Sequence, residues 1–342
     1  MVDINLSLVS AAFVAFGVSV LLLPKFIKFL ESVDIVGTDI QKFSKPKVAE
    51  MGGPVIISGF LAGIFLFIWL NVFIFSNNID VWSMFAGIST ILIIMIIGIF
   101  DDLSSLRKAR EGGHGFEKYK RIGLRQWQKP LLTLPAAIPL MAIMVGNSTM
   151  SIPLIGPVDF GILYPLFIVP IGVVGASNAI NMLAGFNGLE AGLSFVALLS
   201  MGIFGYVHGA IAASSIAFIM AAAVLAFLVF NWYPARILPG DSFVYTIGAA
   251  MAVIAIIGNM QKFTLYIFTP WILEFLLKLR SKFSAENYGI LQKDGTLKSR
   301  YNEVYSLTHL VMKSGKFKEW QVSGIIIAFE IIICSAALLF IA

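Results

Sequence analysis

Residues 82–102 read WSMFAGISTILIIMIIGIFDD, a long apolar run that ends at two adjacent aspartates, Asp101 and Asp102. The apolar part has the length of roughly 20 residues that crosses a bilayer as a helix. The composition of the whole chain points the same way, because 58% of its 342 residues are hydrophobic and only 13% are charged. A soluble domain keeps roughly a quarter of its residues charged. The sequence therefore predicts an all-α integral membrane protein.

Other apolar stretches along the chain also have the length of a membrane span. Together with residues 82–100, they cover about residues 6–24, 54–75, 130–146, 160–177, 191–207, 209–230, 242–259, 263–279 and 321–342. We expect ten transmembrane helices in a single domain that covers residues 1–342. Prolines interrupt the stretches 130–146 and 160–177, where we expect kinks, at Pro135, Pro139, Pro165 and Pro170.

The basic residues fall on one side of this predicted topology. All of the 24 Lys and Arg residues except Lys262 lie in the odd-numbered connections or at their edges. Basic residues favour the cytosolic side, so we expect both termini outside in a multi-pass protein of the cell membrane. The net charge of +5 then reflects orientation and contact with anionic lipids, and we expect no nucleic-acid partner. The cytosolic loops are expected at about 25–53, 101–129, 178–190, 231–241 and 280–320.

The connections on the other side are short. Residues 147–159 alternate enough to predict a small hairpin, and Asn147-Ser148-Thr149 is a glycosylation sequon on that side. The single cysteine, Cys334, excludes an intrachain disulfide and an all-cysteine metal site.

Asp101 and Asp102 stand at the end of a predicted helix, where the helix dipole disfavours negative charge. They are either solvated boundary charges or a site for a cation, because a metal ion or a lysine would relieve their repulsion. Lys129, at the start of the next span, is a candidate for that partner or for binding a phosphate. Glu274 and Lys278, four residues apart, are expected to form an ion pair on a helix.

Residues 178–192 read NAINMLAGFNGLEAG and place several polar side chains after a predicted span. Asn181, Asn187 and Glu190 recur at spacings of three and six residues, so some share a helical face. Amides beside a glycine-bearing turn can coordinate a hard cation or bind a nucleoside. The alternative is that these residues only cap two helix ends.

Residues 231–243, NWYPARILPGDSF, place Asp241 where the next span begins. That position favours an anion, and Asp241 is either a simple cap or part of a site. Three separate connections on one predicted face thus carry carboxylates, amides and a lysine. This set suits Mg²⁺ with a diphosphate, because Mg²⁺ is bound by one or two carboxylates and by substrate phosphates. A transporter is the alternative class, but transporters place polar groups near the bilayer midplane and often contain inverted repeats, which this sequence does not show.

The motifs at 178–192 and 231–243 resemble those of the polyprenyl-phosphate N-acetylhexosamine-1-phosphate transferases, membrane enzymes with about ten spans. The resemblance runs in order from about Gly37 to Asp241 and is nearest to the dolichyl-phosphate N-acetylglucosamine-1-phosphotransferases of eukaryotes and archaea. It implies Mg²⁺-dependent transfer of N-acetylglucosamine-1-phosphate from UDP-GlcNAc to a polyprenyl (dolichyl) phosphate. A lipid phosphate oxygen would attack the β-phosphorus in line, and UMP would leave. This reaction begins lipid-linked oligosaccharide synthesis for N-glycosylation; the alternative is another UDP-N-acetylhexosamine for a cell-surface polymer.

Matched residue by residue, the resemblance implies roles for the polar residues. Asn181 and Asp241 would hold Mg²⁺, and Lys129 would meet the diphosphate. Asp101 and Asp102 would position or deprotonate the lipid phosphate. The residues expected at the nucleotide and the sugar are Ile40, Glu50, Asn187, Leu238, Arg280 and Lys282.

The sequence departs from the family pattern at several positions. Leu238 stands where an aromatic residue is expected near the uracil, and residues 280–300 lack the family's Arg-His-Arg run at the sugar. Ala184 and Asn187 stand where the bacterial muramoyl-pentapeptide branch usually has aspartates, and the histidine triplet of that branch is absent. These departures argue against a peptidoglycan substrate. The sequence leaves open whether two chains form a homodimer.

Overall fold

A computed structural model describes residues 2–111, 128–152 and 156–341 of the chain. Within these ranges, seven helices are long and apolar enough to cross a membrane, as expected for an integral membrane protein. These helices are α1 (Val2–Ser32), α2 (Gly53–Trp69), α3 (Val81–Glu111), α7 (Leu189–Val207), α8 (Ile211–Asn231), α9 (Gly240–Ile257) and α13 (Glu319–Phe340). They match seven of the predicted spans, and α2 extends through a π-helical segment, Leu70–Ile74.

The three other predicted spans are short or interrupted. Residues 128–142 and 164–180 divide into α4 (Gln128–Thr133), a 3-10 turn (Leu134–Ala137), α5 (Ile138–Ala142), a π-helical segment (Tyr164–Ile168) and α6 (Val169–Ile180). The stretch 263–279 divides into α10 (Gln261–Ile267) and α11 (Thr269–Arg280). Each of these segments except α10 has a proline among its first three residues, and proline has no N–H to donate within a helix. The predicted kinks are confirmed, the break at Phe268 was not expected, and the count of ten spans stays a prediction.

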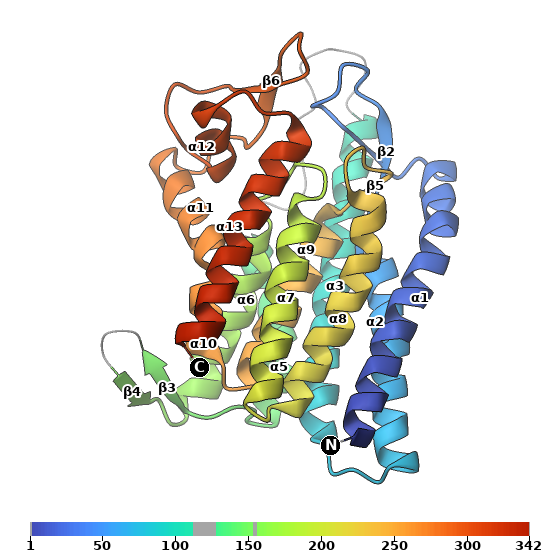
Figure 1. The fold of residues 1–342 in the computed structure, drawn as a ribbon, viewed down its shortest axis with the longest axis vertical. Helices are drawn as coiled ribbons and strands as arrows, with labels where there is room; N and C mark the ends of the chain where they lie inside the picture. Colours follow the sequence, from blue (N-terminus) through green and yellow to red (C-terminus); the bar gives the residue numbers. More distant parts are fainter. Residues whose placement is uncertain (1, 112–127, 153–155, 342) are drawn as a thin grey trace.

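The two ends of the bundle carry different structures (Figure 1). At one end, which we call the sheet end, β1 (Val36–Thr38), β2 (Lys47–Glu50) and β5 (Ile237–Leu238) form a sheet in the order β1-β2-β5. Strand β1 pairs antiparallel with β2, and β2 pairs parallel with β5. Both chain termini lie at the other end, which suits an even number of crossings. An antiparallel hairpin of β3 (Thr149–Ile152) and β4 (Gly156–Asp159) confirms the one predicted for 147–159.

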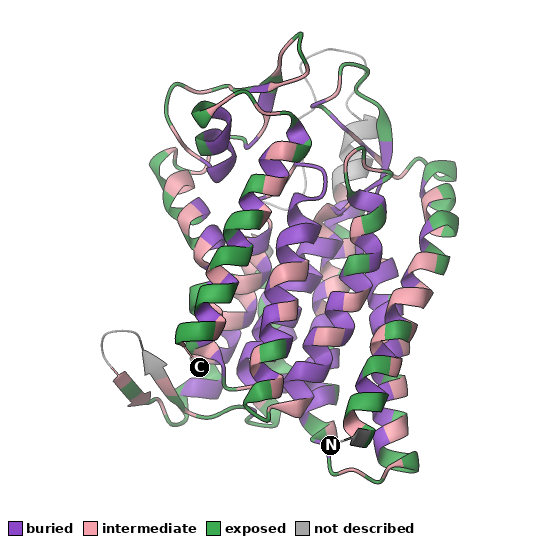
Figure 2. Ribbon diagram, viewed as in Figure 1, coloured by how far each residue is buried: buried purple, intermediate pink, exposed green. Residues whose placement is uncertain are grey.

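Helix α9 is the most enclosed of the long helices, because 83% of the residues in its apolar 18-residue stretch are buried, against 33% in the corresponding stretches of α1 and α13. It packs against α3, α6 and α8, and Figure 2 shows the exposed positions on the outer helices. Lipid is as apolar as the helices, so close packing of small residues carries more weight there than hydrophobic burial. At Gly248 of α9, an added Cβ would lie 2.4 Å from the Ala176 carbonyl oxygen and 2.5 Å from Ser177 Cα of α6.

The segment between α11 and α13 forms a cap at the sheet end, built from β6 (Gly289–Leu291), β7 (Leu297–Ser299) and α12 (Leu307–Ser314). Buried Glu274 of α11 anchors this cap, because its Oε2 accepts hydrogen bonds from Leu307 N at 2.8 Å and Ser306 Oγ at 3.1 Å. Its Oε1 lies 3.9 Å from Lys278 Nζ, which confirms the predicted ion pair. Burial, with repulsion from nearby lysines, lowers the pKa of His309 in the cap, and its ring contacts the Glu286 carbonyl oxygen at 2.9 Å.

We expect Gly248→Ala to lower the melting temperature of the purified protein, because the new methyl group would overlap the backbone of α6. Overpacking of this kind costs about 1–3 kcal/mol. Gly175→Ala makes the same change on α6, where nothing lies within 4 Å of the added Cβ. Thermal unfolding followed by circular dichroism should separate the two variants, and equal melting temperatures would contradict the close approach of α6 and α9.

Candidate active site where α3, α6 and α9 meet

Asp102 joins α3 to the first turn of α9. Its Oδ1 accepts a hydrogen bond from the backbone N of Asp241 at 2.6 Å, and its Oδ2 accepts one from Ser242 N at 3.0 Å. The first N–H groups of a helix have no partner inside the helix, and the helix dipole favours an anion there. Gly240 makes this approach possible, because its φ is +71° and an added Cβ would lie 2.8 Å from Asp102 Oδ2. Asp102 therefore fixes where α9 begins.

The other predicted residues of the cluster meet beside this contact. Asn181, which follows the last residue of α6, donates from Nδ2 to Asp241 Oδ1 at 2.7 Å. Tyr245, one turn after Asp241 on α9, donates its hydroxyl to Asp101 Oδ2 at 3.1 Å. A further side-chain hydrogen bond links Tyr245 with Asn181. The three connections predicted to converge do so, and Tyr245 joins their side chains.

This cluster concentrates negative charge and fits a divalent cation. Asp102 is subject to like-charge repulsion from both Asp241 and Glu50. Among the described residues, no group of three or more His, Cys, Asp and Glu side chains forms a cage for a metal ion. Mg²⁺ needs no such cage, because it keeps waters and is bound by one or two carboxylates plus substrate phosphates. The carboxylate of Asp241 and the amide oxygen of Asn181 match that donor set.

The backbone of Lys129 lies in a helix that packs beside the cluster. It is the second residue of α4, and α4 packs against α3 and α6, two of the helices that carry the cluster. The side chain of Lys129 lies outside the described part of the structure, so its contact with a diphosphate stays a prediction.

The polar residues of 178–192 divide into two groups. Asn178 Nδ2 donates to Val174 O on its own helix at 2.8 Å, and Glu190 Oε1 accepts from Gly185 N at 2.8 Å. Both bonds are local, but neither caps a helix end: Asn178 bonds within α6, and the N-cap of α7 is Gly188, which has no side-chain cap. Asn187 instead donates from Nδ2 to Asp39 Oδ2 at 3.0 Å, and so joins the connection between β1 and β2.

The predicted nucleotide residues Glu50, Leu238 and Ile40 lie on or beside the β1-β2-β5 sheet. Glu50 stands opposite Leu238 in the parallel pairing of β2 with β5. Gly37 of β1 lies against both, since an added Cβ would be 2.4 Å from Glu50 Oε2 and 2.9 Å from Leu238 Cδ1. Ile40 is 36% exposed in the loop that follows β1. Strand β5 runs directly into α9, so the sheet adjoins the aspartate cluster.

Of the two basic residues expected at the sugar, Arg280 ends α11 and bonds to the cap, and Lys282 lies in the cap. Arg280 donates from Nη1 to Val304 O at 3.1 Å, and its Nη2 lies 3.5 Å from Glu303 Oε2. Lys282 is exposed and has a φ of +51°. In the described ranges, neither side chain has a recorded contact with the aspartate cluster, and their role at the sugar stays a prediction.

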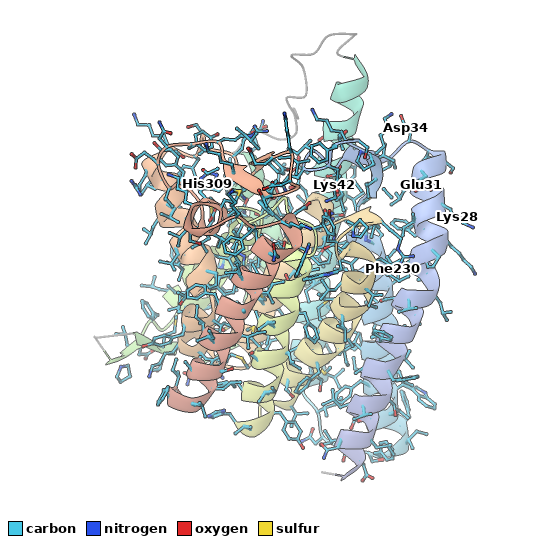
Figure 3. The ribbon with its side chains drawn as sticks, turned by 45° about the horizontal axis from the view of Figure 1, so that its top comes forward. Lys28, Glu31, Asp34, Lys42, Phe230 and His309 are labelled. Carbon is cyan, nitrogen blue, oxygen red and sulfur yellow. The ribbon has the colours of Figure 1, made fainter. Side chains whose placement is uncertain are left out.

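The sequence analysis missed four residues that organise this end of the molecule: Tyr245, Asp39, Lys42 and Glu319. The spacing of four residues between Asp241 and Tyr245 could have indicated the tyrosine, because such residues share a helical face. No local pattern indicates Asp39 or Glu319, since they meet Asn187 from 148 and 132 residues away along the chain. Figure 3 shows Lys42 at the sheet end, as it does His309.

A separate cavity of about 510 Å³ opens at the opposite end of the bundle. Its lining includes Asp80, Asn147, Tyr164 and Asn259, and none of the predicted site residues. The convergent polar side chains and this cavity are therefore at different ends of the protein.

Comparison with known proteins identifies relatives over almost the whole chain. A protein of Saccharolobus solfataricus, provisionally named a UDP-N-acetylglucosamine–dolichyl-phosphate N-acetylglucosaminephosphotransferase, is 36% identical over 89% of this chain and 87% of its own length. A Dictyostelium discoideum protein of that name is 28% identical over 82% of this chain and 74% of its own length. A phospho-N-acetylmuramoyl-pentapeptide-transferase of Streptococcus thermophilus is 28% identical over 92% of both chains.

The model of one protein family, glycosyl transferase family 4, matches residues 84–259. This range contains Asp101 and Asp102 within α3, Asn181 just after α6, and Asp241 in the first turn of α9. The sequence analysis placed the two aspartates at the end of a helix, and this was wrong, because α3 continues to Glu111. Together with the 36% identity of the archaeal relative over most of both chains, the match shows that this chain belongs to glycosyl transferase family 4.

Proposed function

We propose that this protein transfers N-acetylglucosamine-1-phosphate from UDP-GlcNAc to a polyprenyl phosphate such as dolichyl phosphate, and releases UMP. The observation that carries the proposal is the convergence of Asp101, Asp102, Asn181 and Asp241 beside the start of α9. The names of the archaeal and Dictyostelium relatives specify this donor and this acceptor. The reaction would begin the assembly of lipid-linked oligosaccharides.

Phosphoryl transfer depends mainly on positioning and on neutralising charge. Asp241 and Asn181 would hold Mg²⁺, which when bound supplies positive charge at the diphosphate. Lys129 would bind the same diphosphate. Asp101 would orient or deprotonate the lipid phosphate, whose oxygen attacks the β-phosphorus of UDP-GlcNAc. The bond from that phosphorus to the bridging oxygen breaks, and UMP leaves with the bridging oxygen.

The proposed membrane arrangement has ten spans, both termini outside and the active site at the cytosolic face of the cell membrane. The distribution of Lys and Arg supports this orientation. The sheet end carries the aspartate cluster, and both termini lie at the other end (Figure 1). A lipid phosphate in the inner leaflet could then meet a nucleotide sugar from the cytosol at the same cluster.

The contacts of Asn187 favour this donor over the muramoyl-pentapeptide substrate named for the Streptococcus relative. Asn187 Nδ2 donates to the carboxylate of Asp39 at 3.0 Å. An aspartate at position 187, as in the muramoyl-pentapeptide branch, would place two carboxylates in contact and would repel Asp39. The surroundings of position 187 therefore favour an amide side chain over a carboxylate.

The proposed reaction is tested by UMP release from purified protein supplied with dolichyl phosphate, Mg²⁺ and a panel of UDP-N-acetylhexosamines. We expect UMP with UDP-GlcNAc, and none when the lipid phosphate is omitted or the divalent ion is removed by chelation. Preference for a different UDP-sugar would replace the donor named here. Transport of an intact nucleotide sugar without UMP formation would reject the proposed function.

Replacing a charged residue of the cluster should remove most of the activity. We expect Asp241→Ala or Lys129→Ala to lower the rate of UMP release at least ~100-fold, as for other lost electrostatic contacts to a transition state. Asn178→Ala is the matched control, because within the described residues the side chain of Asn178 bonds to its own helix alone. Full UMP release by an Asp241→Ala protein at normal levels would rule out the assigned role.

Replacement of Asp102 should lower both stability and activity, whereas replacement of Asp101 should lower activity alone. Asp102→Asn places an amide NH₂ against one backbone N–H of α9, so we expect the melting temperature to fall by a few degrees along with activity. Asp101→Asn keeps an acceptor for Tyr245, so activity should fall at least about tenfold with an unchanged melting temperature. Melting curves and UMP release measured on both variants test this division. Equal melting temperatures for the two would contradict it.

A further inference from the structure

A buried cluster of four polar side chains fixes Asn187 at the sheet end. Asp39, Asn187 and Glu319 are 7%, 4% and 3% exposed, and they come from the loop after β1, the loop before α7 and the first turn of α13. Lys42 Nζ lies 3.1 Å from Asp39 Oδ2 and also pairs with Glu319. The Lys42 ammonium stands 4.0 Å from the centre of the Tyr233 ring. Three distant segments of the chain thus meet around one lysine.

This cluster holds both the backbone and the side chain of Asn187. Its backbone N donates to Glu319 Oε1 at 2.9 Å, and its carbonyl oxygen accepts from Ser323 Oγ at 2.9 Å. Its side-chain Nδ2 donates to Asp39 Oδ2 at 3.0 Å. A carboxylate paired with a lysine offers only acceptors, so the Asn187 amide must turn its NH₂ group toward Asp39.

The carbonyl oxygen of the same amide is left for another partner. In the described part of the chain, no recorded hydrogen bond reaches Asn187 Oδ1, and this atom is not among the buried side-chain atoms left without a partner. Oδ1 therefore reaches the accessible surface. Asp39, which binds this amide, is followed directly by Ile40, a predicted nucleotide residue. The exposed Oδ1 of Asn187 therefore lies beside the proposed nucleotide site.

We propose that Asp39 is a positioning residue that sets nucleobase specificity, by turning Asn187 so that only a hydrogen-bond acceptor faces the substrate. This inference rests on the proposed function, in which Asn187 meets the nucleoside. Uracil presents an N–H donor at N3, which Asn187 Oδ1 can accept. Cytosine presents an acceptor at N3, so cytosine N3 and Asn187 Oδ1 would face each other with no hydrogen between them to form a bond. Because Asp39 prevents the amide from turning over, the site cannot adapt to cytosine.

The test compares the inhibition of UMP release by UDP and by CDP. Wild-type protein should bind UDP at least about tenfold more tightly than CDP, the ratio expected for one unmatched polar contact. In Asp39→Asn, the side chain at 39 can accept or donate, so Asn187 can turn either way and the ratio should fall to within about threefold. The KM for UDP-GlcNAc should rise while kcat changes little. A purely structural role would weaken both nucleotides equally and leave the ratio unchanged.

Two matched variants complete the test. Asp34→Asn changes an exposed aspartate before β1 that pairs with Lys47 at 3.7 Å, and it should leave the ratio at the wild-type value. Glu319→Gln keeps an acceptor for Asn187 N and leaves the Asp39–Lys42 pair in place, so it should also retain the ratio. If Asp39→Asn does not accumulate, Asp39→Ser, which can also donate or accept, is measured in its place.

The outcomes separate this inference from the proposed function. An unchanged UDP-to-CDP ratio in the Asp39 variant, with UMP still formed from UDP-GlcNAc, overturns the role of Asp39 and leaves the function standing. A wild-type protein that binds both nucleotides equally also overturns it. A protein that binds neither nucleotide rejects the proposed function itself.

Discussion

The contact between the Asp102 carboxylate and the first turn of α9 is the constraint on which the rest of the site depends. Both carboxylate oxygens accept backbone N–H groups, from Asp241 and Ser242, and each bond is assisted by charge and by the helix dipole. The contact fixes the start of the most enclosed long helix against α3. The position of Asp241, and its reach to Asn181 from α6, follow from that start.

The same contact explains why so much negative charge is held in a small region near the membrane. A buried carboxylate is costly unless it is hydrogen-bonded, and Asp102 is satisfied by two backbone donors. Asp101 is hydrogen-bonded by Tyr245, and Asp241 by Asn181. These bonds offset desolvation, but they do not remove the repulsion among the carboxylates. A bound cation or a positively charged side chain would reduce this repulsion and stabilise the site further. Such a site therefore favours the binding of a metal ion together with a diphosphate substrate.

The sequence was informative where function and structure depend on local pattern. Long apolar runs predicted the seven long helices, and prolines predicted the kinks of 130–146 and 160–177. The predicted convergence holds for Asp101, Asp102, Asn181 and Asp241, but Asn187 bonds to Asp39 instead of joining them. The break of 263–279 at Phe268 was not predicted, although Pro270 follows closely. The sheet was missed because β5 has two residues, too few to show alternation. The pairing of Asn187 with Asp39 and Glu319 was missed because nothing near either acid marks a partner more than a hundred residues away.

The geometry of a helix also explains how two adjacent aspartates can have separate tasks. Consecutive residues on an α-helix point about 100° apart, so one carboxylate of the pair can face the end of α9 while the other faces the side of that helix at Tyr245. Both carboxylate oxygens of Asp102 accept backbone hydrogen bonds, so this residue has a structural role. Asp101 meets a side chain that is itself in contact with Asn181, the proposed metal ligand. The pair thus couples the folding of α9 to the chemistry at its start: the residue that holds the helix in place sits next to the one that would meet the substrate.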